Sequence, residues 1–142
     1  MLKLFGAKVG KSVVIKPGVK VKFPWRFEIG DFSWIGEGVW IDNLDYVKIG
    51  HNACLSQGVY LCTGSHRWDM VEFDLLTRPI VIEDSVWVAA KCNVGPGVTI
   101  GEGAVLSFAS TAVHDLRPWG IYGGNPAMWM KDRKFSSTEI NC

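Results

Sequence analysis

The sequence lacks the features that mark membrane and nucleic-acid-binding proteins. No stretch of its 142 residues approaches the roughly 18 consecutive apolar residues that a membrane-spanning helix needs, and the start shows no signal-peptide pattern. Its 15 basic and 14 acidic residues leave a net charge of +1, which gives no general attraction to nucleic acid or to an acidic membrane surface. We therefore expect one cytoplasmic domain over residues 1–142, with no membrane span and no nucleic-acid partner.

Reactive motifs are also scarce. The sequence has no Gly-x-Ser-x-Gly motif and no phosphate-binding loop ending in Lys-Ser or Lys-Thr. Its four cysteines, Cys54, Cys62, Cys92 and Cys142, form no Cys-x-x-Cys pair. We interpret them as free thiols in a reducing compartment, with a metal or disulfide role as the less favoured alternative. No metal site is expected.

What the chain does have is a six-residue repeat of aliphatic residues. The repeat occurs in four runs: Val9, Ile15, Val21, Phe27; Ile29, Ile35, Ile41, Val47; Ile49, Leu55, Leu61; and Ile82, Val88, Val94, Ile100, Leu106. A helix would space apolar residues by three and four, and a half-buried strand would alternate them by two. The six-residue period instead predicts a β-solenoid, although an ordinary β-sandwich stays open as an alternative.

The repeat also suggests how each coil is built. The aliphatic side chains point inward and stack on equivalent residues about 4.8 Å away in neighbouring coils. Glycines three residues later are expected at corners with positive φ; they are Gly18, Gly38, Gly58, Gly64, Gly97 and Gly103. With about 18 residues to a triangular coil, we expect about five coils. Two-residue phase slips, between Phe27 and Ile29 and between Val47 and Ile49, predict bulged corners.

The pattern divides the chain into segments. Residues 1–8 are a lead-in, and residues 9–66 and 80–111 are β-helix coils. Residues 67–79 have no hexad and mix charged with large apolar side chains, which predicts an extruded loop of the kind that often carries function. Residues 112–142 form an exit segment and tail, with a short C-terminal helix expected over residues 127–135 because Asn125 and Pro126 suit a helix start.

Two groups of residues suggest where function lies. His66 stands at a corner directly before the extruded loop, where a neutral imidazole is able to take a proton from a hydroxyl. His51 and His114 are more simply explained as structural or solvated residues. Four tryptophans are expected to point outward, which suggests that another subunit covers this face; they are Trp25, Trp34, Trp40 and Trp87.

The motifs together resemble those of the hexapeptide-repeat acyltransferases, in the group of galactoside, maltose and colanic-acid-type sugar O-acetyltransferases. The resemblance rests on residues 61–66 (LCTGSH), 82–90 (IEDSVWVAA), 94–105 (VGPGVTIGEGAV) and 122–127 (YGGNPA). It implies an all-β, left-handed parallel β-helix and a homotrimer with active sites between subunits. It also implies acetyl-CoA as co-substrate and His66 as general base for direct transfer to a sugar, nucleotide-sugar or lipid-linked sugar.

The resemblance further implies a set of cofactor-binding residues. Main-chain groups at Ala89 and Ala90 would meet the thioester oxyanion. The pantetheine arm would pass Trp87, Phe108 and Ala109 and reach Val113 and His114, and Lys131 with Arg133 would meet the CoA phosphates. The sequence departs from the pattern at Met128, where relatives often have a basic residue, and at Phe108, which would narrow the CoA track. Asn43 and Asp45 are the expected acceptor contacts.

Three alternatives stay open at this point. An amino-sugar N-acetyltransferase would share the same fold and base. A γ-class carbonic anhydrase would need three zinc-binding histidines, but the three histidines here are 15 and 48 residues apart, which does not match that family's spacing. A catalytically silent solenoid would have no need for His66 together with the CoA-side motifs.

Overall fold

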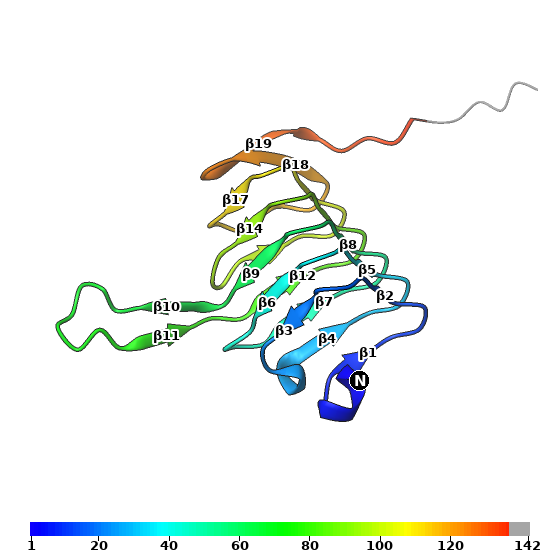
Figure 1. The fold of residues 1–142 in the computed structure, drawn as a ribbon. Coiled ribbons are helices and arrows are strands. Elements are labelled where there is room, and N and C mark those ends of the chain that lie inside the picture. Colours follow the sequence, from blue (N-terminus) through cyan, green and yellow to red (C-terminus); the bar gives the residue numbers. More distant parts are fainter. Residues whose placement is uncertain (137–142) are drawn as a thin grey trace, which may run out of the picture.

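The computed structural model describes residues 1–136, which form a β-solenoid of about six turns, one more than expected (Figure 1). Three sheets make its sides, and all their strands are parallel except β19. Sheet A contains β1 (Lys8–Val9), β4 (Phe27–Ile29), β7 (Val47–Ile49), β12 (Ile80–Ile82) and β15 (Thr99–Ile100). Sheet B contains β2 (Val14–Ile15), β5 (Trp34–Ile35), β8 (Cys54–Leu55), β13 (Trp87–Val88), β16 (Val105–Leu106), β18 (Gly120–Gly124) and β19 (Ala127–Asp132). Sheet C contains β3 (Lys20–Val21), β6 (Trp40–Asp42), β9 (Tyr60–Cys62), β14 (Asn93–Val94) and β17 (Thr111–Ala112).

The core is the stack of inward aliphatic residues that the hexad predicted. In sheet B the inward residues of adjacent strands are register partners, and all four are fully buried: Ile35, Leu55, Val88 and Leu106. Cys92 is also fully buried, and this burial raises the pKa of its thiol. Short 3₁₀ turns, η1 (Leu2–Phe5) and η2 (Pro24–Arg26), lie near the first coils.

The phase slips come from lengthened corners, as expected, but the extra residues lie before each pair of aliphatic residues and not between them. Phe27 and Ile29 both point inward from the same three-residue strand β4, and they pair with Val47 and Ile49 of β7. The first coils are therefore 20 residues long, as the step from Ile29 to Ile49 shows, whereas the step from Ile82 to Ile100 is 18 residues. The strands stay in register because the extra residues are taken up at one corner of the prism rather than by a bulge in a strand.

The helix expected at residues 127–135 is absent, and this prediction was wrong. Residues from Ala127 to Asp132 form β19, which pairs antiparallel with β18 after a turn containing the cis peptide bond Asn125–Pro126. β18 would otherwise leave its backbone N–H and C=O groups unpaired at the end of sheet B, and only a strand is able to pair with them. Ala127 closes the end of the core, since it is buried.

The three corners of the prism differ. We call them the AB, BC and CA corners, after the sheets that they connect in chain order. The AB corner has a residue with positive φ in every coil; the residues are Ser12, Phe32, Asn52, Ser85, Gly103 and Trp119. The BC corner likewise has Gly18, Gly38, Gly58, Lys91 and Ala109. Gly64 does not belong to this set, contrary to expectation. It lies in a strand at the CA corner, where a Cβ would approach the Leu44 side chain to 2.9 Å.

The outer faces of the sheets also differ. Sheet A presents a ladder of charged side chains, Lys8, Glu28 and Lys48. Sheet B presents Trp34 and Trp87, and sheet C presents Trp40 packed against Tyr60 at a ring distance of 5.0 Å. Within residues 1–136, no helix is long and apolar enough to cross a membrane.

Candidate active site

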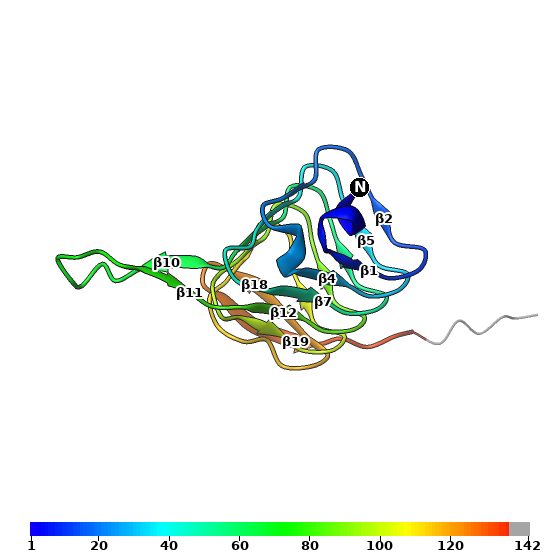
Figure 2. The ribbon, with the colours of Figure 1, turned by 90° about the horizontal axis from the view of Figure 1, so that it is seen from below.

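A β-hairpin leaves the CA corner where the hexad stops. β9 runs on into β10 (Gly64–His66), which pairs antiparallel with β11 (Leu75–Thr77) before the chain returns to β12. The hairpin projects well beyond the solenoid in both views (Figures 1 and 2). Its residues 66–75 are all exposed, so they add nothing to the core.

Buried polar side chains hold the base of this hairpin. The Thr63 hydroxyl donates to the Asp42 carbonyl at 3.0 Å and accepts the Asp45 N–H at 3.0 Å. In the preceding coil the fully buried Asn43 side chain accepts the Phe23 N–H at 2.9 Å and donates to the carbonyls of Phe23 and Arg26. These side-chain bonds replace the backbone hydrogen bonds between coils that the lengthened CA corner cannot form.

The register gives the hairpin two chemically different faces. Gly64 pairs with Thr77, Ser65 with Leu76 and His66 with Leu75. Because side chains alternate along a strand, His66 shares a face with Gly64, which lies against Leu44 of the preceding coil. Ser65 and Arg67 share the other face with Arg78, whose side chain lies over Gly97 of the following coil.

The imidazole of His66 is oriented by Phe73. Nδ1 of His66 lies 3.0 Å from the Phe73 carbonyl oxygen, and the two rings stack with centroids 4.2 Å apart and planes within 7°. A carbonyl oxygen only accepts hydrogen bonds, so Nδ1 must carry the proton. In a neutral imidazole Nε2 is then left with its lone pair, which is the form that a general base needs. Phe73 holds its carbonyl in this direction with a left-handed backbone, φ 50°.

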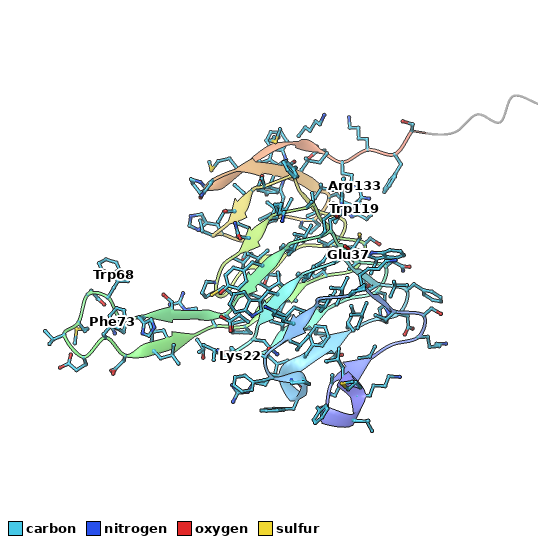
Figure 3. All side chains as sticks on the ribbon, in the orientation of Figure 1. Lys22, Glu37, Trp68, Phe73, Trp119 and Arg133 are labelled. Carbon is cyan, nitrogen blue, oxygen red and sulfur yellow. The ribbon has the colours of Figure 1, made fainter. Side chains whose placement is uncertain are left out.

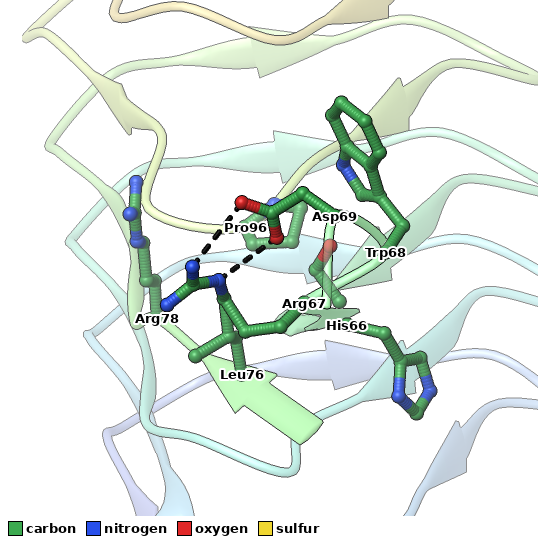
Figure 4. Close-up of a pocket in the computed structure, with 8 residues that line it drawn as sticks. His66, Arg67, Trp68, Asp69, Leu76, Arg78 and Pro96 are labelled. Atoms are coloured by element: carbon green, nitrogen blue, oxygen red, sulfur yellow. Dashed lines mark hydrogen bonds and ion pairs between the residues drawn. The ribbon is translucent and has the colours of Figure 1, made fainter. Parts of the chain in front are cut away.

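The opposite face of the hairpin borders a hollow of about 580 Å³. It is lined by Ser65, His66, Arg67, Trp68, Asp69, Leu76, Arg78 and Pro96. Figure 4 shows the His66 ring turned away from Arg67 and Arg78, so His66 borders this hollow without pointing its ring into it. The hollow and the free Nε2 therefore lie on different sides of the hairpin.

The residues expected to bind CoA fall into two groups. Trp87 lies on the outer face of sheet B, and Ala89, Ala90, Phe108 and Ala109 follow it at successive turns of the BC corner. The second group, Val113 and His114, is exposed at the CA corner, two coils beyond the hairpin. Sheet C separates the groups, so one chain does not bring His66 together with the BC corner.

The two alanines at the BC corner differ in the state of their N–H groups. The Ala89 N–H donates to the Leu106 carbonyl at 2.9 Å, so it belongs to the coil-to-coil ladder. The Ala90 N–H has no acceptor among residues 1–136, and its side chain is half-buried. Of the two expected oxyanion donors, only Ala90 has a free N–H group.

The two basic residues expected at the CoA phosphates also lie apart. Lys131 is exposed on β19, opposite Ile121. Arg133 instead donates from Nη1 to the carbonyls of Ser85 and Gly103, at 2.9 and 3.0 Å, which places it at the AB corner. Figure 3 shows it beside Trp119. These bonds tie the segment after β19 to the solenoid and occupy part of the guanidinium.

The two residues expected to contact the acceptor differ in exposure. Asn43 has no exposed surface, and its amide is occupied by the three bonds described above. Asp45 is half-buried, and its carboxylate accepts the Tyr46 N–H at 2.7 Å. Asp45 therefore stays accessible near the face of the hairpin that carries His66. The Asn43 side chain instead stabilises the backbone of the preceding coil in this conformation.

Several residues at the site escaped the sequence reasoning. Phe73 and Arg78 lie in the segment without a hexad, where no period indicates which side chains meet. Asp42 ends β6 beside the hairpin, and one of its carboxylate oxygens accepts the Tyr60 hydroxyl at 3.1 Å. Burial, together with Cys62 and Asp42, raises the pKa of Tyr60, so this hydroxyl stays protonated. The position of Asp42 directly after the inward-facing Ile41 was the available signal.

Comparison with known proteins gives close matches over nearly the whole chain, although no family model matches it. The putative colanic acid biosynthesis acetyltransferase WcaF of Escherichia coli K12 is 42% identical over 133 residues, which cover 94% of this chain and 73% of that protein. A hexapeptide-repeat acetyltransferase from Vibrio cholerae, VCA0836, was solved with acetyl-CoA and superposes with a TM-score of 0.88 at 26% identity, covering 94% and 75% of the two chains. A maltose O-acetyltransferase from Clostridium difficile 630 superposes with a TM-score of 0.80 at 20% identity, covering 94% and 73%, which supports the fold alone.

Proposed function

Since this chain belongs to the hexapeptide-repeat acetyltransferases, we propose that it transfers the acetyl group of acetyl-CoA to a sugar hydroxyl of an exopolysaccharide or its precursor. The name of WcaF links that relative to colanic acid biosynthesis, and the Vibrio cholerae relative binds acetyl-CoA. The observation that carries the proposal is the hydrogen bond between His66 Nδ1 and the Phe73 carbonyl, because it leaves Nε2 free as a base.

The proposed reaction is a direct transfer. His66 Nε2 takes the proton of the acceptor hydroxyl as the oxygen attacks the thioester carbonyl carbon. The negative charge that forms on the carbonyl oxygen is stabilised by a main-chain N–H, for which Ala90 is the candidate. Collapse of the tetrahedral intermediate breaks the C–S bond, and the imidazolium of His66 returns its proton to the CoA thiolate. The Phe73 carbonyl stabilises the imidazolium while it lasts.

We further propose that the complete site forms between copies of the chain in a homotrimer, with the left-handed winding of the family. His66 and the BC corner lie on opposite sides of sheet C, so a second copy is needed to bring a BC corner to the hairpin. The exposed aromatic rings of Trp34 and Trp87 supply a face suited to such contact. Sedimentation equilibrium tests this directly, and a monomer that retains full activity would rule the shared site out.

The test of the function is CoA thiol release from acetyl-CoA with a panel of neutral sugars, amino sugars and sugar nucleotides. We expect release that depends on a hydroxyl acceptor, and His66→Ala should lower kcat/KM by roughly 10²- to 10⁴-fold while the assembly stays intact. His51→Ala is the matched control, because His51 lies at an AB corner and its Nδ1 accepts the Asp31 N–H at 2.8 Å. Full activity of His66→Ala would remove the general base, and a strict requirement for an amino sugar would replace O-transfer with N-transfer.

A further inference from the structure

The hollow on the far side of the hairpin from the His66 ring carries an excess of positive charge. Arg67 donates from Nε and Nη2 to the two carboxylate oxygens of Asp69, at 3.0 and 3.2 Å, shown as dashed lines in Figure 4. Arg78 lines the same hollow, and among residues 1–136 no carboxylate lies within 4.0 Å of its guanidinium. The hollow thus contains two guanidinium groups and one carboxylate, which leaves a net charge of about +1 facing it.

The stem of Arg78 is held in place before any ligand arrives. Its backbone N–H donates to the Thr63 carbonyl at 3.0 Å, which fixes the start of the side chain at the base of the hairpin. The stem then lies over Gly97, where a Cβ would approach Arg78 Cβ to 3.3 Å and Cδ to 3.1 Å. An arginine whose stem is already packed loses less conformational entropy when its planar fork binds an oxyanion.

The remaining walls suit a small polar ligand with an apolar side. Pro96 and Leu76 supply apolar surface, and the indole of Trp68 is 82% exposed beside them. The volume of about 580 Å³ falls within the range of ordinary small-molecule sites. The hollow is therefore large enough for more than a single bound anion.

We propose that this hollow binds an oxyanion of the acceptor through Arg78, so that the acceptor is an acidic saccharide or a glycosyl phosphate rather than a neutral sugar. This inference rests on the proposed function. Arg67 follows His66 directly in the chain, so an oxyanion held here anchors the acceptor to the hairpin that carries the base. The rest of the acceptor then passes around the edge of the hairpin to reach Nε2 on the other face. The fork of a guanidinium matches a carboxylate or a phosphate equally well, and both supply the chemistry that the hollow recognises.

Binding is measured by calorimetry on the full chain, so that the result does not depend on turnover. The probes are uridine diphosphate glucose, a glucuronic-acid oligosaccharide and a neutral maltose oligosaccharide. We expect at least one acidic probe to bind, Arg78→Gln to weaken it about 10- to 100-fold, and Arg78→Lys to weaken it less. Whichever acidic probe responds identifies phosphate or carboxylate as the recognised group.

Arg117→Gln is the matched control, because it makes the same change of charge at an exposed arginine that pairs with Asp132 on the C-terminal cap. His66→Ala should bind the acidic probe like the wild type while its turnover is lost. Wild-type protein that binds the acidic probe but transfers no acetyl group to it would overturn the transferase mechanism and leave the anion site standing. The anion site is overturned if no acidic probe binds. It is equally overturned if Arg78→Gln weakens the neutral and acidic probes alike, or if it weakens only acetyl-CoA, titrated beside the three probes.

Discussion

The AB and BC corners repeat one conformation from coil to coil, whereas the CA corner differs in almost every coil. The AB and BC corners each turn through a residue with positive φ, whether that residue is glycine, as at Gly38, or not, as at Lys91. At the CA corner the chain makes a 3₁₀ turn at Pro24–Arg26, a loop at residues 43–46, a long hairpin after Thr63, and a short turn at Gly95–Val98. Two corners thus maintain the coil spacing, and the third is free to carry chemistry.

Shortening the hairpin gives the largest expected effect. Replacing residues 66–75 by Asn-Gly would join Ser65 to Leu76 through a tight turn while keeping the base of the hairpin. Activity should fall at least roughly 10³-fold because His66 is lost, but the free energy of unfolding should change by less than about 1 kcal/mol because every removed side chain is exposed. Thiol release and urea denaturation measure the two effects. A large loss of stability would show that the hairpin is part of the fold.

Removing the buried amide beneath the hairpin comes next. Asn43→Ala leaves the Phe23 N–H and the carbonyls of Phe23 and Arg26 without their partner, so the free energy of unfolding should drop by about 3 kcal/mol. Asn93→Ala is the control, since the exposed Asn93 makes one bond, to Thr111. Urea denaturation separates the two variants. If Asn43→Ala is as stable as the wild type yet selectively raises the KM of the acceptor, Asn43 binds substrate after all.

The smallest expected effect tests a repeating corner. At Gly38, with φ 66°, no atom of residues 1–136 other than its own and its chain neighbours' lies within 4 Å of an added Cβ. Gly38→Ala therefore isolates the backbone cost of a left-handed residue, about 1 kcal/mol. Gly95→Ala, at a corner position without positive φ, should cost less, because its Cβ only approaches the Ala112 carbonyl to 3.4 Å. Both values come from urea denaturation. Equal losses at the two glycines would show that crowding rather than φ decides the cost.

The repeating parts of the molecule were predictable because each coil imposes the same constraint. Aliphatic residues such as Ile35 and Leu55 stack at the period that the sequence displays, and the break in the hexad marked where the chain leaves the prism. The structure of the segments without a repeat was harder to predict. The expected helix at residues 127–135 failed because the open edge of sheet B needed a partner strand, which is a tertiary requirement with no local signal.

Of the candidate site, the sequence singled out His66 but not the residues that surround it. His66 stood out by its place at a corner, but nothing local indicated that Phe73 would orient it or that Arg78 would lie on the other face. The sequence also does not reveal that the Asn43 amide is turned inward, toward the backbone of the preceding coil. Such contacts join residues about 20 positions apart at a corner whose length varies, and a periodic pattern does not encode them.

The constant register of the sheets has a consequence for how far this molecule tolerates insertions. Val47 pairs with Ile80 in register although the whole hairpin intervenes, so residues added at the CA corner displace no strand. The entropy of closing a flexible loop grows only logarithmically, so doubling its length costs about 0.6 kcal/mol. Longer or entirely different recognition segments are therefore expected to be graftable at this corner with little thermodynamic penalty, while the core beneath them stays unchanged.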